Sequence, residues 1–116
     1  MNDSIAIKVL EVVGSKLCVA SSDGQKVHDQ IAAALNAGKQ VQLSFSNVES
    51  LTSAFLNAAI GQLYAEFSEQ KIRATLSVSD MTPDDVELLK RVVEAAKQYF
   101  KNPNRVKKIV EETLGE

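Results

Sequence analysis

Hydrophobic residues at every second position predict β-strands in four parts of the chain. In residues 4–12, Ile5, Ile7 and Val9 alternate with Ala6, Lys8 and Leu10, a period of two that is typical of a strand. A glycine-containing turn follows, so residues 17–20 are predicted to complete an N-terminal β-hairpin. The same alternation predicts two further strands, over residues 41–45 and 71–79.

Hydrophobic residues at intervals of three and four predict helices between these strands. The first helix is expected over about residues 24–37, with Val27 and Ile31 on its inner face and Gly38 as its stop. The second is expected to begin at Thr52 or Ser53, either of which could cap it. Gly61 within this helix costs about 1 kcal/mol relative to alanine, so we expect a close backbone contact there, with another element or another subunit.

Two more helices are expected in the C-terminal third of the chain. Thr82 and Pro83 are typical of a helix start, and the pattern continues to about Lys101. A last short helix is predicted within residues 103–116. It would carry basic residues near its start and acidic residues near its end, both unfavourable to the helix dipole. This segment should therefore pack on the domain or on a partner through its hydrophobic residues Val106, Ile109, Val110 and Leu114.

The length and composition indicate one globular domain that spans residues 1–116. Of the 116 residues, 45% are hydrophobic and 24% are charged, which is enough for one ordinary core. The alternation of strands and helices predicts an α/β fold in the order ββαβαβαα. We expect a mixed sheet of about four strands with the helices packed mainly on one face.

The charge and the N-terminal residues limit the partners and the compartment. A net charge of −2 gives no electrostatic support for binding nucleic acid or an anionic membrane. No basic segment followed by a hydrophobic run marks a signal peptide, and no stretch approaches the ~20 residues of a membrane span. A single cysteine, Cys18, fits a reducing compartment. We therefore expect a cytoplasmic protein that binds neither nucleic acid nor membrane.

No combination of residues indicates catalysis. His28 has glycine and alanine at the positions four residues away, so it is predicted to be a solvated helix residue. Cys18 is expected to be a buried, unreactive thiol. The paired spacings of metal ligands and the glycine patterns of nucleotide-binding loops are both lacking. We predict a protein that is not an enzyme and needs no metal or cofactor.

A strand, a polar loop and a hydroxyl-capped helix follow one another over residues 41–61. This region resembles the signature of STAS-type domains, the family named for sulfate transporters and anti-sigma-factor antagonists, and the resemblance covers about residues 40–80. It rests on the frame of hydrophobic and glycine positions Val48, Leu51, Leu56, Ile60 and Gly61. The resemblance implies a STAS-like sandwich and a regulatory role through docking of other proteins.

The residues at the predicted helix start depart from the usual STAS pattern. Thr52 stands where the family has aspartate, and Ser53 matches the first hydroxyl. Ala54 stands where antagonists carry the phosphorylated hydroxyl, and Phe55 replaces a glycine. The phosphorylation switch therefore does not carry over to Ala54. Thr52 and Ser53 are the candidate phosphorylation or anion sites, with simple helix capping as the structural alternative.

The loop and helix start at residues 44–56 form the expected docking surface. Phe55 could be an exposed aromatic contact or could fold over the edge of the core, and the sequence leaves both open. The residues expected to contact a partner are Ser46, Asn47, Glu49, Ser50, Phe55 and Asn57.

Three functions remain open. The first is a regulatory module that binds a histidine-kinase-like ATPase or an anti-sigma regulator. The second is a domain that senses a nucleotide or another small ligand, although the sequence places no basic residue beside the helix start at 52–55. The third is a structural subunit that forms a homo-oligomer through Gly61 and the hydrophobic C-terminal residues.

Overall fold

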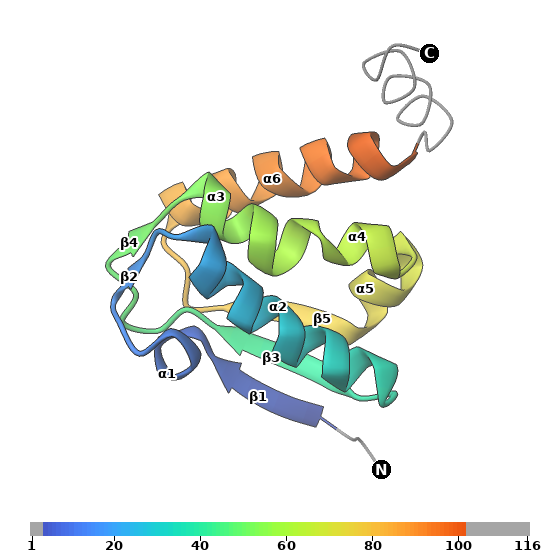
Figure 1. Ribbon diagram of the computed structural model, residues 1–116, viewed down its shortest axis with the longest axis horizontal. Helices are drawn as coiled ribbons and strands as arrows, with labels where there is room; N and C mark the ends of the chain where they lie inside the picture. The colour runs from blue at the N-terminus through green and yellow to red at the C-terminus, as the bar shows by residue number, and fades with distance from the viewer. Residues whose placement is uncertain (1–3, 102–116) are drawn as a thin grey trace.

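The computed structural model describes residues 4–101 as an α/β domain (Figure 1). The helix predicted within residues 103–116 lies outside the described part of the chain. The elements follow in the order β1 (Ser4–Lys8), α1 (Val9–Val13), β2 (Leu17–Cys18), α2 (Ser21–Asn36), β3 (Gln40–Ser44), β4 (Ser50–Leu51), α3 (Ser53–Leu56), the π-helix η1 (Asn57–Gly61), α4 (Leu63–Glu66), α5 (Glu69–Thr75), β5 (Leu76–Ser79) and α6 (Pro83–Lys101).

The main sheet has three parallel strands in the order β1-β3-β5. Ile7 pairs with Leu43, and Leu43 pairs with Val78. Residues that alternate along β1 and β3 are buried on the side of α2, whereas Ala6, Gln42 and Ser77 on the other side are exposed. The predicted α/β class is confirmed. Every pairing in the described residues is parallel, which differs from the mixed sheet that was expected.

The predicted N-terminal hairpin is wrong. The chain leaves β1 at Lys8 and forms the short helix α1, which ends at Gly14 in the left-handed conformation (φ 78°). The hydrophobic residues Val9, Leu10, Val12 and Val13 follow helical spacing, and the period-two pattern of Ile5 and Ile7 conceals this change. β2 then pairs in parallel with β4, 33 residues further along the chain, instead of with β1.

The predicted strand over residues 71–79 is correct only in its second half. Residues 69–75 form α5, which Ser68 caps by accepting a hydrogen bond from the Lys71 amide at 3.1 Å. Only Ile72 of this helix is buried. A strand begins at Leu76, where the chain reaches β3 and can pair with Val41.

The other predicted helices are confirmed with small changes in their bounds. α2 and the continuous segment α3–η1–α4 lie side by side over one face of the sheet, and α6 packs against the far side of that segment (Figure 1). α6 begins as expected, since the Asp85 amide donates to the Thr82 hydroxyl at 3.2 Å. Between the helices and the sheet lies a core that includes Ile31, Leu35, Val41, Leu43, Leu56 and Leu63.

The middle of the second predicted helix is a π-helix, η1. The Gln62 amide donates to the Asn57 carbonyl five residues back, at 3.1 Å. Gly24 of α2 lies against this region, where a side chain would collide with the Phe55 carbonyl and the Ala58 methyl group. A side chain on Gly61 would meet Asn57 and approach Val92 of α6. The neighbours of Gly61 are therefore side chains, Asn57 of the same π-helix and Val92 of α6, and not the close backbone of another element that was expected.

None of the helices within residues 4–101 combines the length and the hydrophobicity needed to cross a membrane.

Candidate functional site

The loop between β3 and α3 is exposed but firmly held. The Glu49 and Ser50 amides both donate to the Lys16 carbonyl, at 2.9 and 3.3 Å, and the Thr52 amide donates to the Cys18 carbonyl at 3.3 Å. Asn47 adopts a positive φ of 64°, a conformation that asparagine tolerates better than most residues. The loop therefore has one defined shape, because its backbone is tied to β2 and its turn is fixed at Asn47.

Thr52 joins the loop to the helix that follows it. Its hydroxyl accepts a hydrogen bond from the Phe55 amide at 3.1 Å, which makes it the N-cap of α3. The same hydroxyl donates to the Val19 carbonyl at 2.7 Å. The capping role weighed for Thr52 is confirmed, and its hydroxyl is fully engaged in structural contacts. Ser53, the first residue of α3, is exposed.

The structure separates the six residues expected to contact a partner into two groups. Phe55 is completely buried (0% exposed), so the exposed aromatic contact is wrong and the core alternative is correct. Its amide donates to the Thr52 cap, and its side chain belongs to the hydrophobic core. The other five are exposed at the surface, and they are Ser46, Asn47, Glu49, Ser50 and Asn57.

A groove runs between the start of α3 and α6. We name it the Arg91 groove; it has a volume of about 500 Å³ and is lined by Ser53, Ala54, Asn57, Leu88, Arg91, Val92 and Ala95. Arg91 is exposed and forms no ion pair or hydrogen bond within residues 4–101. α6 therefore contributes a basic residue to the same groove as Ser53, from 38 positions further along the chain.

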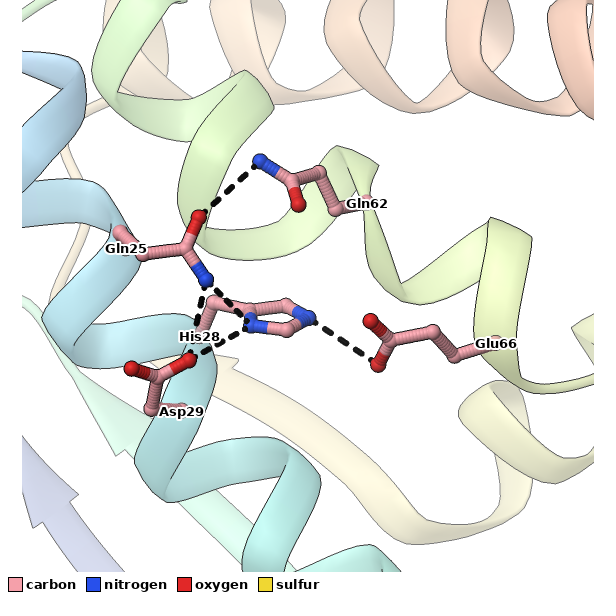
Figure 2. Close-up of polar contacts among 5 residues, drawn as sticks. All are labelled: Gln25, His28, Asp29, Gln62 and Glu66. Atoms are coloured by element: carbon pink, nitrogen blue, oxygen red, sulfur yellow. Dashed lines mark hydrogen bonds and ion pairs between the residues drawn. The ribbon is translucent and has the colours of Figure 1, made fainter.

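A cluster of polar side chains, separate from the Arg91 groove, joins α2 to the α3–η1–α4 segment (Figure 2). His28 lies at its centre and is only 5% exposed, so its prediction as a solvated residue is wrong. Its Nε2 lies 3.1 Å from Oε1 of Glu66, and its Nδ1 lies 3.2 Å from Oδ1 of Asp29. Gln25 and Gln62 complete this His28 cluster.

The donors and acceptors of the cluster follow from its carboxylates, except that Nδ1 of His28 can serve only one of its two neighbours at a time, Gln25 or Asp29. An ionised carboxylate can only accept, so Nε2 of His28 carries a proton and donates to Glu66. The Gln25 carbonyl accepts from the Gln62 amide at 3.3 Å, which directs the Gln25 amide nitrogen toward Nδ1 of His28 at 3.1 Å. A neutral imidazole accepts this hydrogen bond, and a doubly protonated one donates to Asp29 instead.

The Asp29 carboxylate lies within hydrogen-bond distance of two of these side chains. Its Oδ1 accepts from Gln25 at 2.9 Å, and it also lies within hydrogen-bond distance of His28. The bond from Gln25 and then the bond from His28 hold the pKa of Asp29 below its usual value. Both outer carboxylates, Asp29 and Glu66, are exposed, so the cluster fastens two helices together at the surface while its imidazole is buried.

The sequence around His28 contains a signal of its burial. His28 follows Val27 and precedes Ile31 and Leu35 by three and seven residues, so it lies on the hydrophobic face of α2. Neighbours four residues away cannot identify its partner, because Glu66 lies 38 residues further along the chain. Arg91 had no such signal, since its position depends on the packing of α6.

Cys18 and the acidic residues do not form a reactive centre in the described chain. Cys18 is fully buried, and burial followed by the nearby Asp23 carboxylate raises the pKa of its thiol. Within residues 4–101, no three histidine, cysteine, aspartate or glutamate side chains are arranged to hold a metal ion.

Comparison with protein families identifies a match. A family model described as a STAS-like domain of unknown function (DUF4325) matches residues 23–86, more than half of the chain. The match begins in α2 and ends in the first turn of α6, so it includes His28, the exposed loop and the Thr52 cap. No curated protein and no solved structure shows significant similarity to the chain.

Proposed function

Since the chain belongs to the family of STAS-like domains of unknown function, we propose that it is a non-enzymatic regulatory module that binds a protein partner in the cytoplasm. The docking surface is the loop at residues 44–56 together with the start of α3. The resemblance to anti-sigma-factor antagonists favours a histidine-kinase-like ATPase or an anti-sigma regulator as the partner.

The shape of the loop is the observation that carries this proposal. Its side chains Ser46, Asn47, Glu49 and Ser50 are exposed, while its backbone is held by the hydrogen bonds to Lys16 and Cys18. A surface that is already ordered loses little conformational entropy when a partner binds. An exposed loop without such hydrogen bonds would have to become ordered on binding, and the entropy lost in that step would weaken the affinity.

The hydrogen bonds also distinguish the two candidate phosphorylation sites. The Thr52 hydroxyl both caps α3 and donates to the Val19 carbonyl, so a phosphate there would remove the proton that the bond to Val19 needs. Ser53 is exposed beside the loop and beside Arg91, whose charge favours an anion. If the docking surface is switched by phosphate, Ser53 is the residue that can accept it without loss of the bond between Thr52 and Val19.

A comparison of two arginine variants tests the docking surface. Ser50→Arg places a bulky cation in the loop, and Ser77→Arg places the same group on the exposed opposite face of the sheet. We expect the wild type and Ser77→Arg to capture an ATPase or anti-sigma regulator from a lysate of the source cells, as identified by mass spectrometry. Ser50→Arg should lose it, and calorimetry with the purified partner should give the same order.

Two results would contradict the proposal. One is equal capture by Ser50→Arg and Ser77→Arg, which would place the partner elsewhere on the domain. The other is a wild-type protein that captures neither an ATPase nor an anti-sigma regulator.

The Arg91 groove favours a second candidate function, the binding of a nucleotide or another small anionic ligand. Ser53, Asn57 and Arg91 offer a hydroxyl, an amide and a guanidinium to one cavity of about 500 Å³. A ligand that binds only the folded state raises the melting temperature. ATP and GTP should therefore stabilise the wild type and Lys90→Ala, a neighbouring control, but not Arg91→Ala. No shift in the wild type would remove this candidate.

A further inference from the structure

His28 is the one buried polar or charged side chain among the described residues, and the proposed docking function does not use it. Its ring lies between two helices, with Nε2 at 3.1 Å from Glu66 of α4 and Nδ1 directed toward Gln25 and Asp29 of its own helix, α2 (Figure 2). In proteins, imidazole is the side chain that ordinarily gains or loses a proton between about pH 5 and pH 8. The His28 cluster is therefore built around a side chain of the type that exchanges protons near neutral pH.

When the ring is neutral, the Gln25 amide nitrogen serves two acceptors. Nε2 of His28 keeps its proton for Glu66, so Nδ1 has a free lone pair. The two hydrogens of the Gln25 amide can then reach Nδ1 at 3.1 Å and Oδ1 of Asp29 at 2.9 Å. The Gln25 carbonyl accepts from the Gln62 amide at 3.3 Å. The neutral ring therefore supports a chain of hydrogen bonds that runs from His28 through Gln25 to Gln62.

A second proton on the ring breaks this chain at Gln25. Nδ1 then carries a hydrogen and lies 3.2 Å from Oδ1 of Asp29, to which it can donate. The same hydrogen would meet the Gln25 amide nitrogen, another donor, at 3.1 Å. If the amide turned over, its carbonyl would face the Asp29 carboxylate, and both groups only accept. The Gln25 side chain must therefore move away, and its bond to Gln62 is lost with it.

The charged groups around the ring favour this exchange. Asp29 and Glu66 face it from two helices, and in the described chain neither carboxylate pairs with a lysine or an arginine. On α2 itself, Asp23 and Lys26 pair with each other. The elements α1, α3, η1 and β3 also pack on α2, and their only charged residue is Glu11 of α1, which is paired as well. A ring with two protons would therefore have an uncompensated carboxylate acceptor on each side.

The exchange reaches a cavity at the surface. Gln62 lines a cavity of about 350 Å³ together with Asn57 and Tyr99, and Asn57 also lines the Arg91 groove. While the ring is neutral, the Gln62 amide donates to Gln25 and is engaged within the fold. After the exchange, this amide is free to donate to a molecule in the cavity.

We propose that His28 is a proton switch, in which a second proton on its ring replaces the His28–Gln25 bond by a His28–Asp29 bond and releases the Gln62 amide into the cavity that it lines. The switch does not depend on the docking function, because it involves neither the loop at residues 44–56 nor a partner.

Nuclear magnetic resonance of the full chain, labelled with ¹⁵N, tests the switch between about pH 8 and pH 5, the range in which imidazole ordinarily titrates. The ring nitrogens of His28 report its protonation, and the side-chain amides of Gln25 and Gln62 report the exchange. At the high end of the range, Nε2 should carry the proton. As the pH falls, both amide signals should shift with the same midpoint as the ring. The side-chain amide of Gln42, exposed on the far face of the sheet, should not shift.

Three results would overturn the proposal. The first is a neutral ring with its proton on Nδ1, because the Gln25 amide could then not donate to it. The second is a ring that keeps one protonation state over the whole range. The third is a pair of Gln25 and Gln62 amide signals that do not follow the titration of the ring.

A matched pair of variants separates the ring from the carboxylates. His28 is the single histidine of the chain, so His28→Gln removes imidazole titration altogether, and the Gln25 and Gln62 amide signals should stay constant. Gln30→Ala, at an exposed position of the same helix, should keep the wild-type shifts. If the signals still shift in His28→Gln, a carboxylate drives the change and His28 is not the switch. The wild-type titration decides the proposal by itself if His28→Gln does not fold.

Discussion

Thr52 and His28 are polar residues that both join distant parts of the fold, but they do so in different ways. Thr52 acts mainly within its own helix, where its hydroxyl caps α3, and its second bond reaches Val19, 33 residues away. His28 is buried, and its bond to Glu66 links α2 to α4 over 38 residues. The cap could be predicted from neighbouring residues, whereas the role of the histidine required the packing of two helices.

The loop and the His28 cluster therefore differ in what they offer a partner. The loop has exposed side chains on a fixed backbone, which suits recognition. The cluster has a buried ring surrounded by its own hydrogen-bond partners, which suits the attachment of helices. Phe55 belongs to the docking loop in sequence but to the core in space. Its variants should therefore report on stability and not on docking.

Phe55→Ala should give the largest effect on the free energy of unfolding. Phe55 is fully buried, and truncation of a buried phenylalanine costs about 3–5 kcal/mol. Ala54→Ser, a change at the exposed neighbouring position, is the control. Urea unfolding followed by circular dichroism measures both. A loss below about 1 kcal/mol for Phe55→Ala would contradict the core position, since surface changes are of that size or smaller.

His28→Ala should give the second largest effect and would test whether the cluster is structural. It removes the contacts with Gln25, Asp29 and Glu66 and leaves unfilled space between α2 and α4, so we expect a loss of about 1–3 kcal/mol in the free energy of unfolding. Gln30→Ala, at an exposed position of α2, is the control. If the two variants were equally stable in urea, the structural role of His28 would be contradicted, and the solvated position predicted from the sequence would be supported.

Thr52→Ala should lower the free energy of unfolding by about 1 kcal/mol, the usual contribution of an N-cap. Thr52→Ser keeps the hydroxyl and should retain most of that stability, and Ser53→Ala should change little. These three variants can be ranked by thermal denaturation. If Ser53→Ala were the more damaging alanine variant, the cap would lie one residue further along the chain.

Asp29→Asn should give the smallest effect, visible in the pH dependence of stability. The bonds from Gln25 and His28 lower the folded-state pKa of Asp29. Its stabilisation is therefore present above the unfolded value of about 3.9 and is lost as the pH falls through the folded value. Between about pH 6 and pH 3, wild type should lose more stability than Asp29→Asn because the variant lacks this titration. Equal losses in urea unfolding at the two pH values would contradict these bonds.

The sequence by itself determined the α/β class, most helix positions and the two helix starts that a threonine hydroxyl caps, at Thr52 and Thr82. These features depend on residues within about one turn of one another, so periodicity and capping are sufficient to predict them. The same patterns indicated the STAS-like family, which the match over residues 23–86 confirms. They failed at residues 9–13 and 69–75, where short helices carry too few residues for their period to be distinguished from that of a strand.

Only the tertiary structure decided which residues face one another. It paired β2 with β4, placed Phe55 in the core, buried His28 beside Glu66 and brought Arg91 to Ser53. Each of these results joins residues that are more than 25 positions apart or depends on how two helices pack. Which residues are buried and which strands pair at such separations depends on how all segments of the chain pack together into one core. A local sequence pattern contains no information on that packing.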